Sequence, residues 1–108
     1  MTKDNSVYIK HIKESISKIL VYTKNFSKTS FNDNPLVQDA VIRQLELIGE
    51  ATKRISKEFR DKYPDVPWQD MAGMRDILIH DYLNVDLDIV WKTVKIDIPK
   101  LNKIIKSI

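Results

Sequence analysis

The residues best suited to chemistry lie close together between Met74 and Tyr82. Arg75 is the only lysine or arginine between Tyr63 and Trp91, a segment that also carries six aspartates and sums to −5. One guanidinium in so acidic a segment indicates a specific task rather than bulk charge. Arginine, histidine and carboxylates together suit metal-independent cleavage of a phosphodiester, in which an imidazole moves a proton and a guanidinium neutralises the developing phosphate charge.

The spacing of these residues predicts their local geometry. On a helix with about 100° per residue, Asp76 lies one turn before His80, so its carboxylate can contact the imidazole, fix its tautomer and raise its basicity. Arg75 and His80 point roughly 140° apart. One straight helix therefore directs both at a single small target only if Arg75 reaches round, the helix deforms near Ile79, or a second chain supplies one partner.

The same side chains also fit a purely structural role. A histidine near the end of a helix interacts favourably with the helix dipole, and a tyrosine two residues on, here Tyr82, is commonly a half-buried packing residue. A hydrogen-bonded helix junction would use these residues equally well. Spacing alone leaves both interpretations open.

The composition narrows the class of protein. A chain of 108 residues predicts one domain, spanning residues 1–108, with a single modest core. The absence of cysteine excludes disulfides, thiolate metal sites and cysteine nucleophiles, and the two histidines stand too far apart to predict a closed zinc site. We expect no cofactor and no metal. No apolar run approaches the roughly 18 residues that span a bilayer, so we expect no membrane association and a cytoplasmic location.

The positive charge lies at the two ends of the chain. Residues 1–54 hold nine basic and six acidic residues. The tail after Ile98 holds three lysines and no acidic residue, so its net charge is +3. Lys3, Lys10, Lys13 and Lys24 fall on one flank of a predicted first helix. This flank could follow a phosphate backbone, or it could simply be a solvated face.

Apolar periodicity predicts helices throughout and no strand. The first runs from about Asn5 to Lys24, and its inward face consists of Tyr8, Ile9, Ile12, Ile16, Ile19 and Leu20. A polar connection from Phe26 to Asn34 follows, and the second helix starts at Asn34-Pro35 and continues to about Lys62. A third runs from about Trp68 to Ile79 or beyond, with Met71 and Met74 inward. Asp86 caps a final helix in which Pro99 should introduce a kink or a break. The predicted fold is an all-α antiparallel four-helix bundle, with the last helix kinked or split at Pro99.

The apolar face of the predicted second helix is unusually wide. Ala40, Leu47 and Ala51 broaden it to an arc near 160°, more than an ordinary surface helix needs. The excess indicates burial on two sides, either between helices of the bundle or against a second subunit. Gly49, at mid-helix, costs about 1 kcal/mol relative to alanine, which predicts a close backbone approach there. Its neighbour Glu50 faces away and reads as a surface acid.

The motif and the blocks that flank it resemble those of the HepT-like toxins, a branch of the HEPN superfamily of small helical ribonucleases. The motif itself is Arg75, four residues, His80, one residue, Tyr82. Flanking blocks match in the same order from about residue 5 to residue 105: Asp39-Ala40-Val41-Ile42-Arg43, Leu45-Glu46-Leu47-Ile48-Gly49-Glu50-Ala51, Pro67-Trp68, Gly73-Met74-Arg75, Val85-Asp86, Val90-Trp91 and Ile98-Pro99-Lys100-Leu101. The residue after the arginine is often asparagine in such proteins and is Asp76 here.

The resemblance implies a homodimer in which the arginines and histidines of both chains line one cleft. It implies metal-independent RNA cleavage with Arg75 and His80 as catalytic residues. It also implies a toxin–antitoxin system of the type VII kind, in which a minimal nucleotidyltransferase of the MntA type silences the toxin by AMPylating Tyr82. A larger hetero-oligomer with that antitoxin would then be possible.

Two other functions fit the same residues. The chain could be a non-catalytic helical subunit that binds a minimal nucleotidyltransferase and presents Tyr82 to it. It could also be a plain dimerisation module, in which neither His80 nor Tyr82 matters. Cleavage of RNA by the free protein, and its loss in His80→Ala, would separate the nuclease from both.

Overall fold

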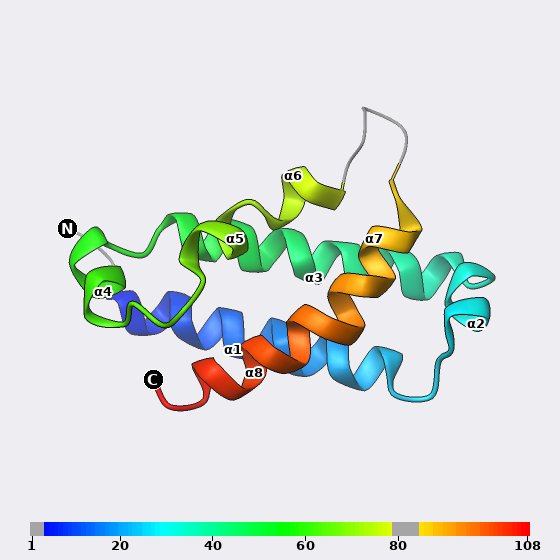
Figure 1. Cartoon of the computed structure of the whole chain (residues 1–108), viewed down its shortest axis with the longest axis horizontal. Helices are drawn as coiled ribbons and strands as arrows, with labels where there is room; N and C mark the ends of the chain where they lie inside the picture. Colours follow the sequence, from blue (N-terminus) through cyan, green and yellow to red (C-terminus); the bar gives the residue numbers. More distant parts are fainter. Residues whose placement is uncertain (1–3, 79–84) are drawn as a thin grey trace.

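The computed structural model describes residues 4–78 and 85–108, and every regular element among them is a helix (Figure 1). The all-α prediction is confirmed. Two long helices, α1 (Asn5–Thr23) and α3 (Pro35–Lys53), lie side by side and run antiparallel. The remaining helices pack around this pair.

Helix α1 begins where the sequence predicts it. The Asp4 side chain accepts a hydrogen bond from the Ser6 backbone N–H, which satisfies one of the free donors at the helix start. The hydrogen bonds from the Ser6 backbone and hydroxyl lower the pKa of the Asp4 carboxyl. The predicted inward face is buried: Ile9, Ile12, Ile16 and Ile19 are all 5% exposed or less.

A short helix, α2 (Lys28–Asn32), occupies a segment predicted to be a polar connection. Ser27 and Ser30 hydrogen-bond to each other's backbone N–H groups in a capping box, which starts the helix. The helix buries Phe31 completely and sets its ring 5.1 Å from that of Trp91. This helix has only five residues and one buried aromatic, so it shows no periodic spacing of apolar residues. The sequence pattern therefore does not predict it.

The second predicted helix is two helices, so its expected continuation to Lys62 is wrong. Helix α3 starts at the predicted Asn34 cap and ends at Lys53, and α4 (Lys57–Lys62) begins anew after Ser56. The Ser56 hydroxyl accepts from the Phe59 N–H, and Asn5 of α1 bonds to both the backbone N–H and the hydroxyl of Ser56. A contact with a residue 51 positions away therefore stabilises the break, and local propensity does not reveal it.

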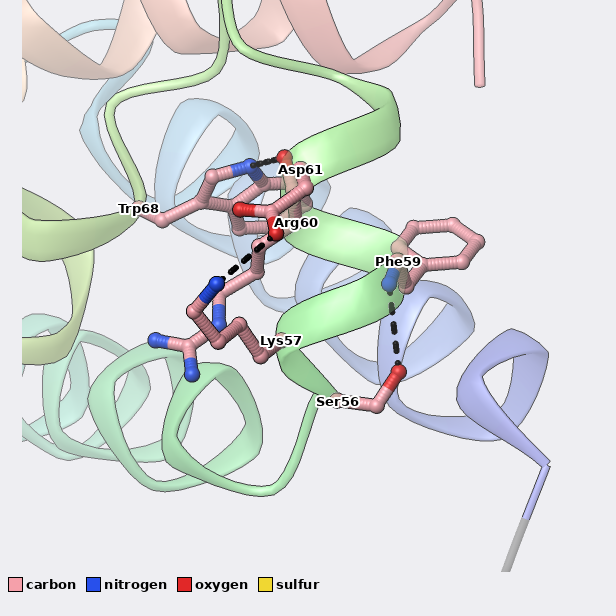
Figure 2. A network of polar contacts seen from close by, with 6 residues as sticks. All are labelled: Ser56, Lys57, Phe59, Arg60, Asp61 and Trp68. Carbon is pink, nitrogen blue, oxygen red and sulfur yellow. Dashed lines mark hydrogen bonds and ion pairs between the residues drawn. The ribbon is translucent and has the colours of Figure 1, made fainter.

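Trp68 ties α4 to the next helix, α5 (Trp68–Ala72). Its indole N–H donates to the carbonyls of Arg60, at 3.1 Å, and Tyr63, at 3.0 Å, and the side chain is only 8% exposed. Figure 2 shows the indole beside α4, where Lys57 and Asp61 form an exposed ion pair at 3.0 Å. The tryptophan fixes the start of α5, and hence the direction of the chain towards Arg75.

The third predicted helix is divided at Gly73 into α5 and α6 (Met74–Leu78), so a single helix from Trp68 to Ile79 is wrong for the described part. The Gly73 N–H still donates to Gln69, but glycine is the poorest helix former after proline and the chain turns there. Met71 and Met74 point inward as predicted, with 0% and 7% exposure.

The last helix is irregular before Pro99 rather than broken at it. Asp86 caps α7 (Leu87–Lys92) as predicted, and α7 continues through a π-helical stretch, η1 (Thr93–Asp97), into α8 (Ile98–Ile105). The N–H of Ile98 donates to the Thr93 carbonyl, five residues back. Proline supplies no N–H and crowds the carbonyl four residues before it, and the wider preceding turn relieves that conflict. The helix therefore stays continuous.

One apolar core joins the described helices, with Met74 of α6 in it and Phe59 of α4 packed against it. Its fully buried side chains come mainly from α1, α3, α5, α7 and α8, with Phe31 from α2. None of the described helices is both long enough and apolar enough to cross a membrane.

Candidate functional site

Helix α6 places two of the predicted site residues at the surface. Met74 is buried and anchors the helix, while Arg75 and Asp76, which follow it, are both exposed. Neither charged side chain forms a hydrogen bond or ion pair with another described residue. The Arg75 guanidinium therefore keeps its donors available for an anion from outside the chain.

The position of α6 depends on a close contact between α5 and the middle of α3. A Cβ added to Gly49 would lie 3.4 Å from the Ala72 carbonyl oxygen and 3.5 Å from that of Met71. The predicted close approach at Gly49 is thus confirmed, although an alanine methyl would still fit at ordinary contact distance. A larger side chain would push α5 outward. Since α6 follows after one residue and also packs on α3, Gly49 helps to position Arg75.

The other two motif residues, His80 and Tyr82, lie outside the described residues. The approach of Asp76 to His80, and the convergence of Arg75 with His80, therefore remain predictions.

A hollow of about 400 Å³ adjoins α6 between α5 and the last helix. Its floor is apolar, with Met71 and Met74 on one side and Leu101 on the other, and its rim carries charged residues. One of these is Lys100, from the basic tail. Asp70 and Asp97 also line the hollow, so its charged side chains give no net positive charge beside the motif.

The lysine flank of α1 does not border α6 within one chain. Lys13 donates to the backbone carbonyl of Ile108 at 2.6 Å, and Lys10 and Lys13 line a hollow beside Phe59 and Tyr63. Figure 1 shows α3 between α1 and α6.

One surface cluster was missed by the sequence analysis. A groove of about 490 Å³ runs between α1 and α3, lined by Tyr8, His11, Glu14, Ser15, Lys18, Gln44, Leu47, Glu50, Ala51 and Arg54. Singly, His11 and Glu50 read as ordinary surface residues. The antiparallel pairing of α1 and α3 brings them into one groove, so only the pairing of the two helices could have revealed it.

Among the described residues, no group of three histidines or acids is arranged to hold a metal ion.

The family model for ribonuclease HepT-like proteins matches residues 12–108. This chain belongs to the HepT-like family. The match includes α3, α6 and the last helix, so the exposed Arg75 lies within the part of the chain that defines the HepT-like family.

Several curated HepT-like relatives are similar along nearly the whole chain. "Putative RNase MJ1380" of Methanocaldococcus jannaschii is 43% identical over 94% of this chain and 93% of its own length. "Probable ribonuclease HepT" of Thermococcus cleftensis is 45% identical over 94% of this chain and 92% of its own length. "Gamma-glutamylcyclotransferase and putative RNase MJ0434" of M. jannaschii is 50% identical over all 108 residues, and the chain spans about half of that protein, 49%. No solved structure matches the chain.

Proposed function

We propose that this protein is a metal-independent endoribonuclease, the toxin of a toxin–antitoxin pair. The observation that carries the proposal is membership of the HepT-like family together with Arg75 on α6, which is exposed and has no ion pair or hydrogen bond with another described residue. The relatives' printed names point the same way, since they describe putative or probable ribonucleases.

The proposed chemistry needs only side chains of the motif. His80 takes the proton of the ribose 2′-hydroxyl, or protonates the leaving 5′-oxygen, as the 2′-oxygen attacks the adjacent phosphorus. The P–O5′ bond breaks, which leaves a 2′,3′-cyclic phosphate on one fragment and a 5′-hydroxyl on the other. Arg75 neutralises the charge that grows on the phosphate oxygens, and Asp76 orients His80.

Two copies of the chain form the proposed active site. On one straight helix Arg75 and His80 would point roughly 140° apart, and we propose that a second copy, rather than a deformed helix or a long reach by Arg75, brings the two groups to one phosphate. Arg75 of one copy therefore acts with His80 of the other, in a homodimer with RNA in the cleft between them.

The products of RNA cleavage test this function directly. We expect the purified protein to cut single-stranded RNA in the presence of EDTA, because no step requires a metal ion. The fragments should carry 2′,3′-cyclic phosphate and 5′-hydroxyl ends, measured by mass spectrometry. Cleavage that stops in EDTA, or fragments with 5′-phosphate ends, would exclude this chemistry. A protein that cuts no RNA would leave the role of a non-catalytic subunit that presents Tyr82.

Regulation by AMPylation of Tyr82 is part of the proposal. The phenolate oxygen of Tyr82 attacks the α-phosphorus of ATP on an MntA-type nucleotidyltransferase, and pyrophosphate leaves. Each AMP unit adds bulk and a negative charge two residues from His80, so an incoming RNA phosphate meets a steric block and repulsion.

Mass spectrometry tests this regulation. Incubation with an MntA-type nucleotidyltransferase and ATP should add whole AMP units to the wild type and abolish its RNA cleavage. Tyr82→Phe should gain no mass and remain active in the same mixture, while Tyr63→Phe, the control, should be modified like the wild type. Modification of Tyr82→Phe to the wild-type extent would place the AMP on another residue.

A further inference from the structure

A basic hollow with aromatic walls lies between α1, α4 and the end of the last helix, and the proposed chemistry makes no use of it. Its volume is about 380 Å³, and we call it the α4 hollow. Two of its lining residues are lysines, two are aromatic and none is acidic; they are Ser6, Ile9, Lys10, Lys13, Phe59, Tyr63 and Ile108. Figure 1 shows the start of α1, α4 and the C-terminal segment together at one end of the molecule.

The two lysines of the hollow are available to an anion. Lys10 is exposed and Lys13 is half-buried, and neither forms an ion pair with another described residue. The Lys13 ammonium donates to the backbone carbonyl of Ile108 at 2.6 Å, which uses one of its three hydrogens. Positions three apart on a helix are neighbours, so the two ammonium groups can bind adjacent phosphates.

The aromatic wall of the hollow is a pair of rings on α4. Phe59 and Tyr63 stand one helical turn apart, with ring centroids 5.0 Å from each other and planes tilted by 43°. Both side chains are only partly buried. A partly exposed ring beside lysines is the arrangement on which unpaired bases of a single strand stack, whatever the base.

The hollow is held in shape at both ends of α4. Asn5 of α1 bonds to the backbone N–H and the hydroxyl of Ser56, both at 3.0 Å, where α4 begins. At the other end, the Trp68 indole donates to the carbonyls of Arg60 and Tyr63. The rings therefore keep their place beside α1 without a ligand, and binding needs little further ordering.

The motif needs a source of positive charge elsewhere. The segment from Tyr63 to Trp91 sums to −5, and two aspartates accompany Lys100 in the hollow beside α6. The affinity of proteins for RNA comes largely from lysines and arginines that contact phosphates. A surface with one guanidinium among so many carboxylates attracts a polyanion poorly, so the lysines that hold the RNA lie on another surface.

We propose that the α4 hollow is a second RNA-binding site, which holds single-stranded substrate away from the point of cleavage. Lys10 and Lys13 contact the phosphates, and bases stack on Phe59 and Tyr63. Phosphates and ring faces carry no base code, so the hollow accepts any sequence. The proposal rests on the proposed function, since it supplies the affinity that the motif lacks.

The hollow lies at the end of the molecule from which α5 runs towards the motif (Figure 1). The Phe59 ring contacts that of Trp68, with centroids 6.2 Å apart. Trp68 is the first residue of α5, which α6 and Arg75 follow. RNA that leaves the hollow past α4 can therefore continue along α5 to the motif.

The same lysines could instead lie against an anionic membrane, or serve only as a solvated face. A helix on a membrane presents its apolar side chains on an exposed face. Here the two rings are partly buried in a hollow, where a flat bilayer surface reaches them less well than an inserted base does. The geometry therefore favours a single strand of nucleic acid.

The salt dependence of binding tests the two lysines. A fluorescent 2′-O-methyl oligouridine of about 12 nucleotides, a length typical of single-strand sites, lacks the 2′-hydroxyl and reports binding without cleavage. Replacing both lysines, as Lys10→Ala with Lys13→Ala, should raise Kd about tenfold. The slope of log affinity against log salt should fall by about 1.4, from two phosphate contacts at about 0.7 each.

The matched control for this pair is Lys18→Ala with Lys24→Ala. It removes two exposed lysines from the same end of the chain, on or next to α1 but outside the hollow. Its slope against salt should equal that of the wild type. In a cleavage assay with long RNA, Lys10→Ala with Lys13→Ala should raise KM and leave kcat unchanged, because the reacting groups are untouched.

Stacking is tested at Tyr63. Tyr63→Ala removes the ring and should raise the Kd for the same oligouridine about tenfold, whereas Tyr63→Phe keeps the ring and should bind like the wild type. Circular dichroism and the unfolding midpoint show whether each variant is folded. If Tyr63→Ala unfolds, the lysine pair, which lies outside the core, decides the question.

Three results would overturn this site. They are an unchanged Kd and salt slope after removal of both lysines, a folded Tyr63→Ala that binds as tightly as Tyr63→Phe, and a wild type that binds phosphatidylserine vesicles but not the oligouridine. An oligouridine bound through Lys10, Lys13 and Tyr63 by a protein that cuts no RNA would contradict only the proposed function. RNA cleavage indifferent to both lysines would contradict only the α4 hollow.

Discussion

His80→Ala should abolish RNA cleavage while leaving the fold intact. Removal of a general acid–base group lowers the rate by about 10²–10⁴, and no other imidazole is available, since His11 lies in the groove between α1 and α3. The rate of cleavage of a fluorescent RNA under single-turnover conditions measures the effect. Circular dichroism and sedimentation should match the wild type, because the substitution removes no core side chain that the structure describes.

His11→Ala is the matched control for this substitution. It removes the only other histidine, from an exposed position on α1, and should leave the cleavage rate unchanged. If His80→Ala cleaves at the wild-type rate, the imidazole has no part in the mechanism. If only His11→Ala loses activity, the α1–α3 groove rather than α6 holds the reacting group.

Arg75→Ala should lower the cleavage rate by about 10²–10³, the usual cost of removing one group that stabilises transition-state charge. Its stability should hardly change, since Arg75 is exposed and contacts no described residue through a hydrogen bond or ion pair. Arg75→Lys keeps the charge but loses the planar fork of donors, so it should recover only part of the rate.

Chemical denaturation and single-turnover kinetics together separate catalysis from folding for Arg75. Lys92→Ala, on α7, removes an exposed positive charge elsewhere and serves as the control. Equal rates for Arg75→Ala and Lys92→Ala would show that the guanidinium acts only as part of the general charge. An unfolding midpoint that falls strongly in Arg75→Ala would indicate a structural role instead.

The sequence predicts helices well where an apolar period or a cap defines them. The Asn34-Pro35 start, the Asp86 cap and the inward isoleucines of α1 all follow from local rules, and the structure confirms them. The breaks depend on other parts of the chain. Asn5 of α1 bonds to Ser56, where α4 begins, and the π-helix spreads the effect of Pro99 over the turn before it. Neither shows in a local pattern.

For the candidate site, too, some features follow from the local sequence and others depend on how distant segments pack. Residue types and spacing identify Arg75 and Asp76, and the structure places both at the surface of α6, beside a hollow that Lys100 reaches. The role of α5 in holding that helix against Gly49 needs the packing of two backbones, which no single stretch of sequence encodes.

A mixture of two inactive variants tests the central claim, that the arginine of one copy works with the histidine of the other. Arg75→Ala and His80→Ala, refolded together in equal amounts, should form mixed dimers as half of the population, and each mixed dimer keeps one of two complete pairs. Since half of the dimers then have one of their two pairs complete, RNA cleavage should return to about a quarter of the wild-type rate. A mixture as inactive as its two components, with mixed dimers demonstrably present, would contradict a site shared between two chains.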